Sequence, residues 1–317
     1  MNGAKQSAIF DIEEGTYAII PLLWGVFLNT AKRIYKIISN EILESDIGVQ
    51  MSDNDLISFL LSSKFAIKTK TEIPFKAIDV KTYDIPFVFD TLIIDSNLEC
   101  DLLNYLSFLP NFRISRFVQL RLYFSVSYDF IDKLLVLLQD KGYYNIDIIV
   151  NSDCNTSSSD YHKLLQLYPY HLSKIIIMNY SLPIVNDNPR LIFNKIKMQD
   201  CALCGIIDES LISINIDTLC RYKNGNTCLW RKVSISVDGL ICNCPSLPYT
   251  YGSIRENDIL EVVKNSTYQK ISNIKKSEIE VCKDCEFRVF CTDCRANAGV
   301  YLKPNKCKYN PYNPIDL

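Results

Sequence analysis

Thirteen cysteines in a chain of 317 residues constrain its folding more than any other feature. Cys100 and Cys154 stand alone, and the other eleven fall between Cys201 and Cys307. Crowded thiols form disulfides in an oxidising compartment and hold metal in a reducing one. Residues 1–15 do not have the basic and apolar segments of a secretion signal, and the apolar run 17–28 is shorter than the ~20 residues that span a bilayer. We therefore predict a cytoplasmic protein, without a membrane partner, whose clustered cysteines ligate metal.

Charge and composition further limit the classes of protein to which the chain can belong. The chain has 34 Lys and Arg against 36 Asp and Glu, a formal charge of −2. Without a basic excess it cannot gain affinity by releasing counterions from phosphates, so no nucleic-acid partner is predicted. Hydrophobic residues make up 48% and charged residues 22%, which is typical of a globular chain. His162 and His171 are the only histidines, which leaves little material for a histidine-centred site.

The first stretch, residues 1–82, reads as an α+β module. We predict strands at 7–12, 16–20 and 65–69 and helices at about 21–43 and 52–61. This order resembles the small winged-helix modules that recognise the leader peptides of ribosomally made, modified peptides. The resemblance implies a peptide-recognition role, and an ordinary α+β cap on the next domain is the alternative.

The second stretch, residues 83–200, alternates strands and helices. We predict strands at 91–95, 118–124, 146–150 and 174–178, and helices at 102–109, 130–140 and 161–168. Such spacing indicates βαβ units and a parallel sheet, so the fold class is α/β with partial, barrel-like (β/α) repeats. The loops after the strands show neither a phosphate-binding glycine motif nor a close catalytic pair. We assign no catalytic residue and interpret this sheet as a scaffold.

The third stretch, residues 201–317, contains the clustered cysteines. A hairpin is predicted at 233–242, because Asp238 and Gly239 suit a type I′ turn. A helix should begin after Asp258, which can cap it. Four lysines are expected to solvate the outer side of that helix: Lys264, Lys270, Lys275 and Lys276.

Two C-x-x-C pairs lie within thirteen residues of this stretch, Cys282 with Cys285 and Cys291 with Cys294, and Cys307 follows. Such a pair puts two thiolates on one tight turn, an arrangement that suits a soft metal. Structural zinc usually takes its four thiolates from two separated knuckles. The compact spacing here favours iron–sulfur ligation, for which four cysteines per cluster are usual, and zinc stays open as the alternative.

Written out, the tail is Cys-x10-Gly-x4-Cys from Cys228 to Cys244, followed by the two pairs and Cys307. This pattern resembles the SPASM domain of many radical SAM peptide-modifying enzymes, over about the last hundred residues. The family usually has three residues inside the last pair, whereas this chain has two.

The resemblance implies two 4Fe–4S clusters. The first would take Cys228, Cys244 and Cys294, with Cys220 as the nearest candidate for the fourth ligand and Cys201 or Cys204 as its rivals. The second would take Cys282, Cys285, Cys291 and Cys307. Cys100 and Cys242 are interpreted as bystander thiols.

A radical SAM enzyme carries C-x3-C-x2-C after its first barrel strand, and this sequence holds no such triplet. The corresponding loop offers Cys100 alone, so neither radical SAM chemistry nor S-adenosylmethionine is expected. SPASM proteins of this kind, with Cys-Thr-Asp-Cys-Arg-Ala in the tail, resemble the peptide maturase of grasp-with-spasm systems. That resemblance implies a component that binds a ribosomal precursor peptide and assists an ATP-grasp ligase, which joins side chains through ester or amide bonds.

Two other classes of function stay open from the sequence. One is an enzyme that uses the clusters in redox or radical-type peptide modification. The other is a zinc-stapled interaction protein. Whether the chain itself catalyses a bond change, the sequence leaves open.

Overall fold

The computed structural model describes residues 86–153, 155–184, 188–200, 207, 216–296, 298 and 301–312, together with residue 62 and six short strands before residue 70. The chain forms two compact units. Unit 1 comprises Met1–Asp84, Gly205–Cys228 and Ile274–Leu317, and unit 2 comprises Ile85–Cys204 and Leu229–Asn273. The hairpin that we predicted in the third stretch therefore belongs with the sheet of the second.

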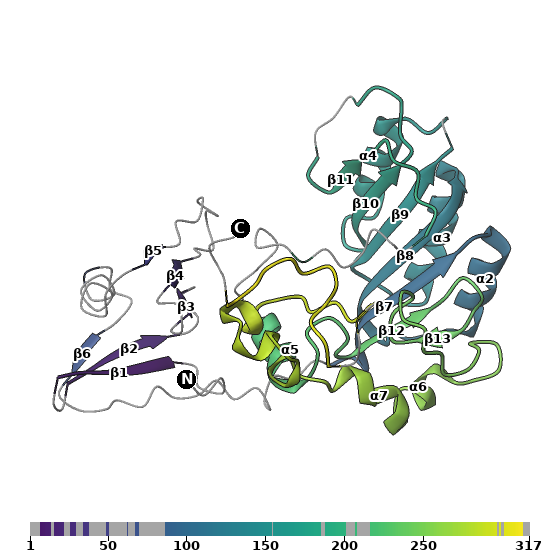
Figure 1. Ribbon diagram of the computed structural model, residues 1–317. Helices are drawn as coiled ribbons and strands as arrows, with labels where there is room; N and C mark the ends of the chain where they lie inside the picture. Colours follow the sequence, from purple (N-terminus) through teal and green to yellow (C-terminus); the bar gives the residue numbers. More distant parts are fainter. Residues whose placement is uncertain are drawn as a thin grey trace. The chain divides into compact units, whose positions relative to one another are not determined.

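A mostly parallel seven-stranded sheet forms the centre of unit 2 (Figure 1). The strands lie in the order β11-β10-β9-β8-β7-β12-β13, and only the pair β12–β13 is antiparallel. Their bounds are β7 Phe89–Ser96, β8 Ser115–Val126, β9 Ile146–Ser152, β10 Leu172–Met178, β11 Leu191–Phe193, β12 Lys232–Ile235 and β13 Ile241–Cys242. The predicted strands and the α/β class are confirmed, and the sheet is extended by strands that the sequence analysis did not pair with it.

Three helices connect the parallel strands: α2 Glu99–Phe108, α3 Tyr128–Asp140 and α4 Ser158–Leu167. Leu92 of β7, Leu120 of β8 and Ile148 of β9 are fully buried and form one core with Leu134 and Leu164 of the helices. Strand β7 is buried at seven of its eight residues, as is typical of a central strand in a parallel sheet.

The hairpin β12–β13 closes through a three-residue loop and not through the predicted type I′ turn. The Gly239 N–H donates to the Ser236 carbonyl, and of the loop residues only Gly239 has a positive φ, +77°. A type I turn followed by one left-handed residue is the usual three-residue hairpin loop. The Asp-Gly pair thus marks the hairpin correctly, but its aspartate keeps an ordinary φ.

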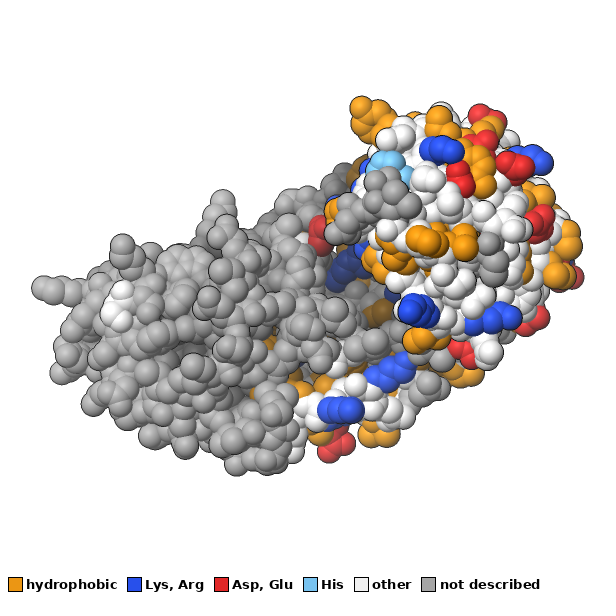
Figure 2. Space-filling model, turned by 90° about the horizontal axis from the view of Figure 1, so that it is seen from above, with side chains coloured by type: hydrophobic (Ala, Val, Ile, Leu, Met, Phe, Trp, Pro, Cys, Tyr) orange, Lys and Arg blue, Asp and Glu red, His pale blue; other side chains and the backbone are white. Residues whose placement is uncertain are grey.

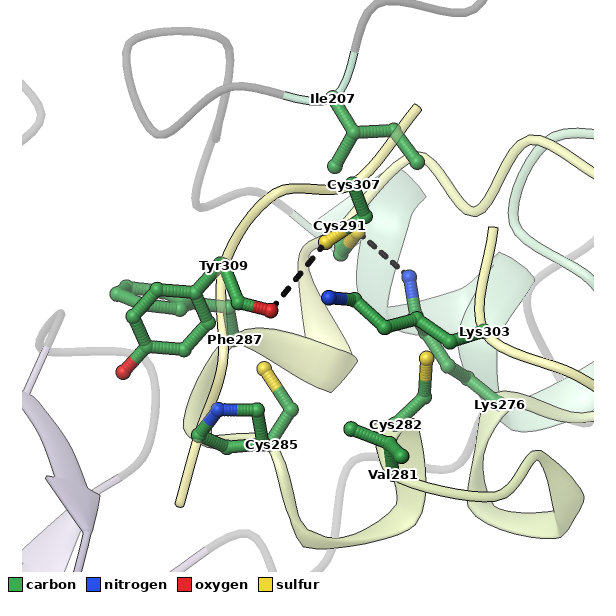
Figure 3. Close-up of a pocket in the computed structure, with 11 residues that line it drawn as sticks. Ile207, Lys276, Val281, Cys282, Cys285, Phe287, Cys291, Lys303, Cys307 and Tyr309 are labelled. Atoms are coloured by element: carbon green, nitrogen blue, oxygen red, sulfur yellow. Dashed lines mark hydrogen bonds between the residues drawn. The ribbon is translucent and has the colours of Figure 1, made fainter. Parts of the chain in front are cut away.

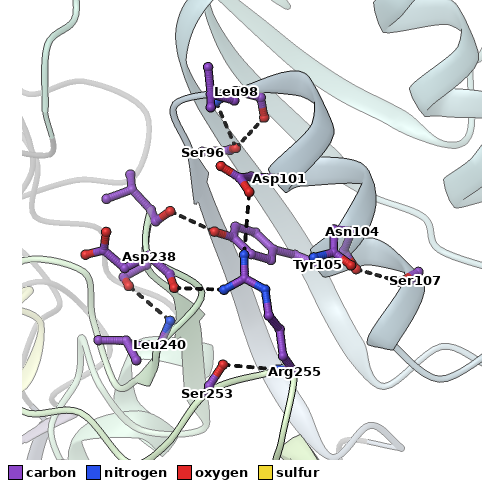
Figure 4. Close-up of polar contacts among 12 residues, drawn as sticks. Ser96, Leu98, Asp101, Asn104, Tyr105, Ser107, Asp238, Leu240, Ser253 and Arg255 are labelled. Atoms are coloured by element: carbon purple, nitrogen blue, oxygen red, sulfur yellow. Dashed lines mark hydrogen bonds and ion pairs between the residues drawn. The ribbon is translucent and has the colours of Figure 1, made fainter.

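Helix α2 holds this hairpin loop in place (Figure 4). The Tyr105 hydroxyl donates to the Val237 carbonyl at 2.8 Å. The Arg255 guanidinium lies over the Tyr105 ring, 5.1 Å from its centroid, and reaches Asp101 at 3.5 Å. These contacts fix the return strand, which leads directly to Cys242 and Cys244.

Two short helices follow the hairpin where we predicted one. Helix α6 spans Ile259–Val262 and is capped by Asp258, as predicted, through a 2.8 Å bond to the Leu260 N–H. Helix α7 spans Ser266–Ser272 and has its own cap, Asn265. Because an asparagine side chain competes for backbone N–H groups, Asn265 ends one helix and starts the next.

The described amino-terminal elements of unit 1 are strands. Their bounds are β1 Ser7–Glu13, β2 Thr16–Pro21, β3 Val26–Asn29, β4 Ile34–Ile37, β5 Val49–Gln50 and β6 Ile67–Thr69, in the sheets β1-β2-β6 and β3-β4-β5. The predicted strand pair at 7–12 and 16–20 is present and antiparallel. The predicted helix at 21–43 is wrong, since β3 and β4 pair antiparallel within it. The β-branched and aromatic residues of these segments favour strands. The helix predicted at 52–61 lies outside the described residues.

In the cysteine-rich part of unit 1, the described residues form one α-helix and three turns of 3₁₀ helix. They are α5 Ile216–Asn224, η4 Lys276–Glu278, η5 Cys282–Asp284 and η6 Glu286–Val289. A small buried cluster includes Leu219, Phe287 and Phe290. Among the residues that the structure describes, this cluster supplies few apolar contacts to the loops around the cysteines.

The surface of unit 2 carries isolated apolar side chains. Tyr170, Leu167 and Phe112 are exposed, and Figure 2 shows hydrophobic side chains interspersed with charged ones on the face in view. Scattered exposure of this kind is ordinary for a folded chain. Among the described residues, no helix combines the length and apolar character that crossing a membrane demands.

Candidate metal centre

Four cysteines of unit 1 line one cavity: Cys282, Cys285, Cys291 and Cys307. Figure 3 shows their side chains directed into this cavity. Its volume is about 50 Å³, several times the ~10–15 Å³ that a single water molecule needs. The cavity therefore has room for a group of several atoms between the sulfurs. These four residues are the set that the sequence resemblance assigns to one cluster, and their ligation stays a prediction.

Three of the four cysteines are buried, and the cavity itself is partly open to solvent. Cys282, Cys285 and Cys291 are 5%, 9% and 7% exposed, and Cys307 is half-buried. Apolar side chains complete the wall, including Phe287. A thiolate in such surroundings is the ligand type that soft metals and iron–sulfur clusters take.

Tight local turns bring the first pair to the cavity. Cys282 begins η5, and the Cys285 N–H donates back to the Cys282 carbonyl at 3.1 Å. Val281, directly before the pair, has a φ of +67°. Its ψ is −48°, and the Cys282 N–H donates to the Glu280 carbonyl at 2.8 Å, so Val281 is the central residue of a γ-turn with positive φ, which is a rare and strained turn. The chain thus accepts local strain at the point where it turns the pair inward.

The other two cysteines are held by different contacts. The Cys291 N–H donates to the Phe287 carbonyl at 3.0 Å, at the end of η6. Cys307 forms a parallel bridge with Ile207, and its N–H donates to the Pro304 carbonyl at 3.0 Å. Three chain segments of unit 1 therefore meet at the cavity.

Lys276 is buried beside the sulfurs, with a residue exposure of 3%. Its Nζ lies 2.6 Å from Cys291 Sγ and 3.8 Å from the Asp293 carboxylate. Burial alone would lower the pKa of Lys276, but the negative charges of Cys291 and Asp293 outweigh it and raise the pKa. A buried ammonium beside a sulfur stabilises the thiolate form that a metal requires.

Asp293 connects this lysine to the loop that precedes β12. The Asp293 carboxylate pairs with Arg295 at 2.6 Å and accepts from Asn226 Nδ2 at 2.6 Å. Asn226 in turn accepts from the Cys228 N–H at 3.0 Å, and Thr227 donates to the Cys291 carbonyl at 2.6 Å. The two residues between Cys291 and Cys294 are thus anchored by a buried polar network.

Without bound metal, Cys282 is held as a thiol. Burial raises its pKa to about 11, against the opposing attraction of Lys276. Because metal ligation requires the thiolate, loading this site has to release a proton from Cys282.

The other predicted ligand set is divided between the units. Cys220, Cys228 and Cys294 belong to unit 1, whereas Cys244 belongs to unit 2. Cys220 lies buried on α5, and Cys294 is also buried. None of the four lines the cavity described above, and Cys201 and Cys204, the rivals for the open position, lie outside the described residues.

Two further described thiols, Cys100 and Cys242, lie on elements of unit 2. Cys100 is exposed at the start of α2, and Cys242 is buried in β13, where its sulfur contacts the Ser234 carbonyl at 3.7 Å. Within the parts of the chain that the structure describes, no three His, Cys, Asp or Glu side chains are grouped closely enough to chelate one ion. The sulfurs of the cavity surround a volume and do not converge on a point.

Sequence reasoning missed the polar residues behind the sulfurs. Lys276 was expected on the solvated side of a helix, and this is wrong, because it begins a 3₁₀ turn and is buried. Asp293 was counted only as a spacer between cysteines. The sequence did contain a signal for this: Asp293 lies between Cys291 and Cys294. In so short a loop, a charged side chain has to lie close to the cysteines, so it needs a partner of opposite charge there.

Comparison with known proteins gives the class. Residues 227–286 match the family model SPASM, described as an iron-sulfur cluster-binding domain. The match includes Cys228, Cys244, Cys282 and Cys285 and ends before Cys291. The chain therefore carries an iron–sulfur cluster-binding domain of this type.

A crystal structure of selenomethionine BtrN in an open conformation resembles the chain with 13% sequence identity and a TM-score of 0.32, covering 62% of this chain and 92% of that one. Among curated proteins, none matches.

Proposed function

We propose that the chain is an iron–sulfur protein that takes part in the maturation of a ribosomally made peptide. In this proposal Cys282, Cys285, Cys291 and Cys307 hold one 4Fe–4S cluster. A second is held by Cys220, Cys228, Cys244 and Cys294. The observation that carries the proposal is the cavity with four cysteines on its wall, next to a segment that matches a cluster-binding domain.

The residues around the cavity suit such a group. The thiols are buried, the wall is largely apolar, and two lysines, Lys276 and Lys303, lie among the sulfurs. A bound cluster would supply four metal–sulfur links to a segment whose own apolar core is small, and so contribute folding free energy directly. The chain's part is to aim the thiolates, balance their charge with Lys276 and exclude water.

The peptide-processing role rests on the sequence. Residues 1–82 would bind the leader of the precursor peptide. The partial (β/α) barrel-like sheet would serve as the scaffold, without radical SAM chemistry. The chain would present the precursor to an ATP-grasp ligase, which condenses two side chains with loss of water while ATP is hydrolysed. The Cys-Thr-Asp-Cys-Arg-Ala segment of the tail supports this reading by its resemblance to maturases of this kind.

Cysteine variants test the cluster part of the proposal. Cys285→Ser and Cys291→Ser are each expected to lose iron, and amide exchange over residues 274–312 should then become fast, because the small core does not hold that segment alone. Cys100→Ser is the matched control, since Cys100 is exposed on α2, and it should keep both iron and protection. Full iron content in Cys285→Ser and Cys291→Ser would refute the ligand assignment.

A ligation assay tests the role itself. The full chain is mixed with ATP, a ribosomal precursor peptide and an ATP-grasp peptide ligase of a grasp-with-spasm system. Mass spectrometry should show loss of one water per cross-link, faster with the chain than without it, and slower with Cys285→Ser. Equal rates with and without the chain would refute the proposed role and leave the cluster assignment untouched.

A further inference from the structure

Lys276 is a buried cation whose closest described partner is a cysteine sulfur. Its side chain is 4% exposed, and its Nζ lies 2.6 Å from Cys291 Sγ. The Asp293 carboxylate is more distant from this lysine, at 3.8 Å, and lies closer to Arg295, at 2.6 Å. The ammonium of Lys276 is therefore placed to donate to the sulfur first and to the carboxylate second.

A hydrogen-bond donor to a ligand sulfur changes the reduction potential of the metal group that the sulfur binds. The reduction potential of an iron–sulfur cluster depends on hydrogen bonds to its sulfurs, on nearby charge and on solvent exposure. A positive charge favours the reduced cluster, because reduction adds an electron. The effect is strong for a buried charge and weak for one in water, since the effective dielectric differs severalfold.

We propose that Lys276 sets the reduction potential of the cluster held by Cys282, Cys285, Cys291 and Cys307, an inference that rests on the proposed function. Lys276 is a positioning residue that acts through the Cys291 sulfur, and it raises the potential. Asp293 opposes it, because its carboxylate places a negative charge beside the same ammonium. Reduction is a one-electron step in which the cluster gains the electron that an external low-potential donor loses.

The structure separates charge from geometry at this site. Thr227 holds the Cys291 carbonyl at 2.6 Å and carries no charge. Lys283 is a second lysine next to a predicted ligand, but it is exposed on η5. Substitutions at these two positions therefore disturb the loop or remove a nearby charge without touching the buried ion pair.

The test is an anaerobic redox titration of the full, cluster-loaded chain with dithionite, followed by visible absorbance and electron paramagnetic resonance. Lys276→Met should lower the midpoint potential enough to change the oxidised-to-reduced ratio at least tenfold, which is about 59 mV for one electron. Asp293→Asn should raise the midpoint, and Lys276→Arg should stay near the wild type. Lys283→Met serves as the control and should leave the midpoint in place, and Thr227→Val, which disturbs the loop without removing a charge, should shift it less than Lys276→Met does.

The sign of the shifts decides the inference. Opposite shifts in Lys276→Met and Asp293→Asn support it, whereas an unmoved midpoint in Lys276→Met, or shifts of the same sign, overturn it. If Lys276→Met loses its cluster, the other two variants test the inference. A raised midpoint in Asp293→Asn together with an unchanged midpoint in Lys276→Arg supports it. Any other result overturns it. A wild-type chain without iron and sulfide would refute the proposed function as well, whereas an iron-loaded chain with unmoved potentials would refute this inference alone.

Discussion

Gly239 occupies a position that only glycine can hold without strain. Its φ is +77°, and a Cβ built there would lie 2.8 Å from the Tyr105 ring. The Tyr105 ring cannot easily give way, because it is 1% exposed and its hydroxyl is bonded to Val237. Both the backbone conformation and the packing against Tyr105 therefore require glycine at this position of the β12–β13 hairpin loop.

We predict that Gly239→Ala is more destabilising than Gly142→Ala. Gly142 has a similar φ, +78°, but a Cβ there would meet no atom within 4 Å. Both variants pay the left-handed cost of roughly 1–2 kcal/mol, and Gly239→Ala adds a collision worth typically 1–3 kcal/mol. The free energy of unfolding in urea should show this order, and equal losses would mean that Tyr105 does not confine the loop.

The sequence predicted which four cysteines lie together, but it did not predict the residues that surround them. The spacing and the resemblance selected Cys282, Cys285, Cys291 and Cys307, and the structure places them on one cavity wall. Lys276 escaped prediction because a lysine beside another lysine, after a helix, reads as solvated surface. Its burial depends on Asp293, which is distant in sequence, and on tertiary contacts that no local pattern encodes.

At the scale of elements, local patterns predicted unit 2 closely. Strands β7 to β10 and helices α2 to α4 follow the predicted ranges, since period-two and helical apolar patterns are strong there. The pairing of β12 with β7 was not predicted, because residues so far apart in sequence are joined by tertiary packing. In residues 21–43 the apolar positions fit a helix, yet the segment contains paired strands. Strand formation depends on pairing with neighbouring strands, which the spacing of apolar residues does not reveal.

Helix α4 carries a capping box with a measurable pH dependence. The Asp160 carboxylate accepts from Lys163 at 2.8 Å and from the Ser157 hydroxyl at 2.6 Å, and these bonds lower its pKa to about 2 from an ordinary 3.8. A carboxylate whose pKa is depressed on folding contributes stability above its unfolded pKa and loses it as the pH falls.

We therefore predict that Asp160→Asn is less stable than the wild type near neutral pH and that the difference shrinks between pH about 4 and about 2. Thermal unfolding of both proteins over this pH range measures it. A difference that stays constant down to the acid end would show that the Asp160 carboxylate is not preferentially ionised in the folded chain.

At the scale of the whole molecule, the two units have different sources of stability. Unit 2 has a large continuous core that includes the sheet, its three helices and the hairpin. In the described part of unit 1, a small apolar cluster lies near the cysteines, together with buried charges such as Asp293 and Arg295. The sequence predicted three successive stretches, whereas the chain passes from unit 1 to unit 2 after Cys228 and back after Asn273. Such interleaving follows from the pairing of β12 with β7, which composition cannot reveal.

If the cysteines of the tail hold iron and sulfide, the number of iron, acid-labile sulfide and zinc atoms per chain after anaerobic purification measures it directly. Two 4Fe–4S clusters require about eight iron and about eight sulfide per chain, and no stoichiometric zinc is expected. Stoichiometric zinc without sulfide, or cysteines joined in disulfides, would contradict this cluster assignment.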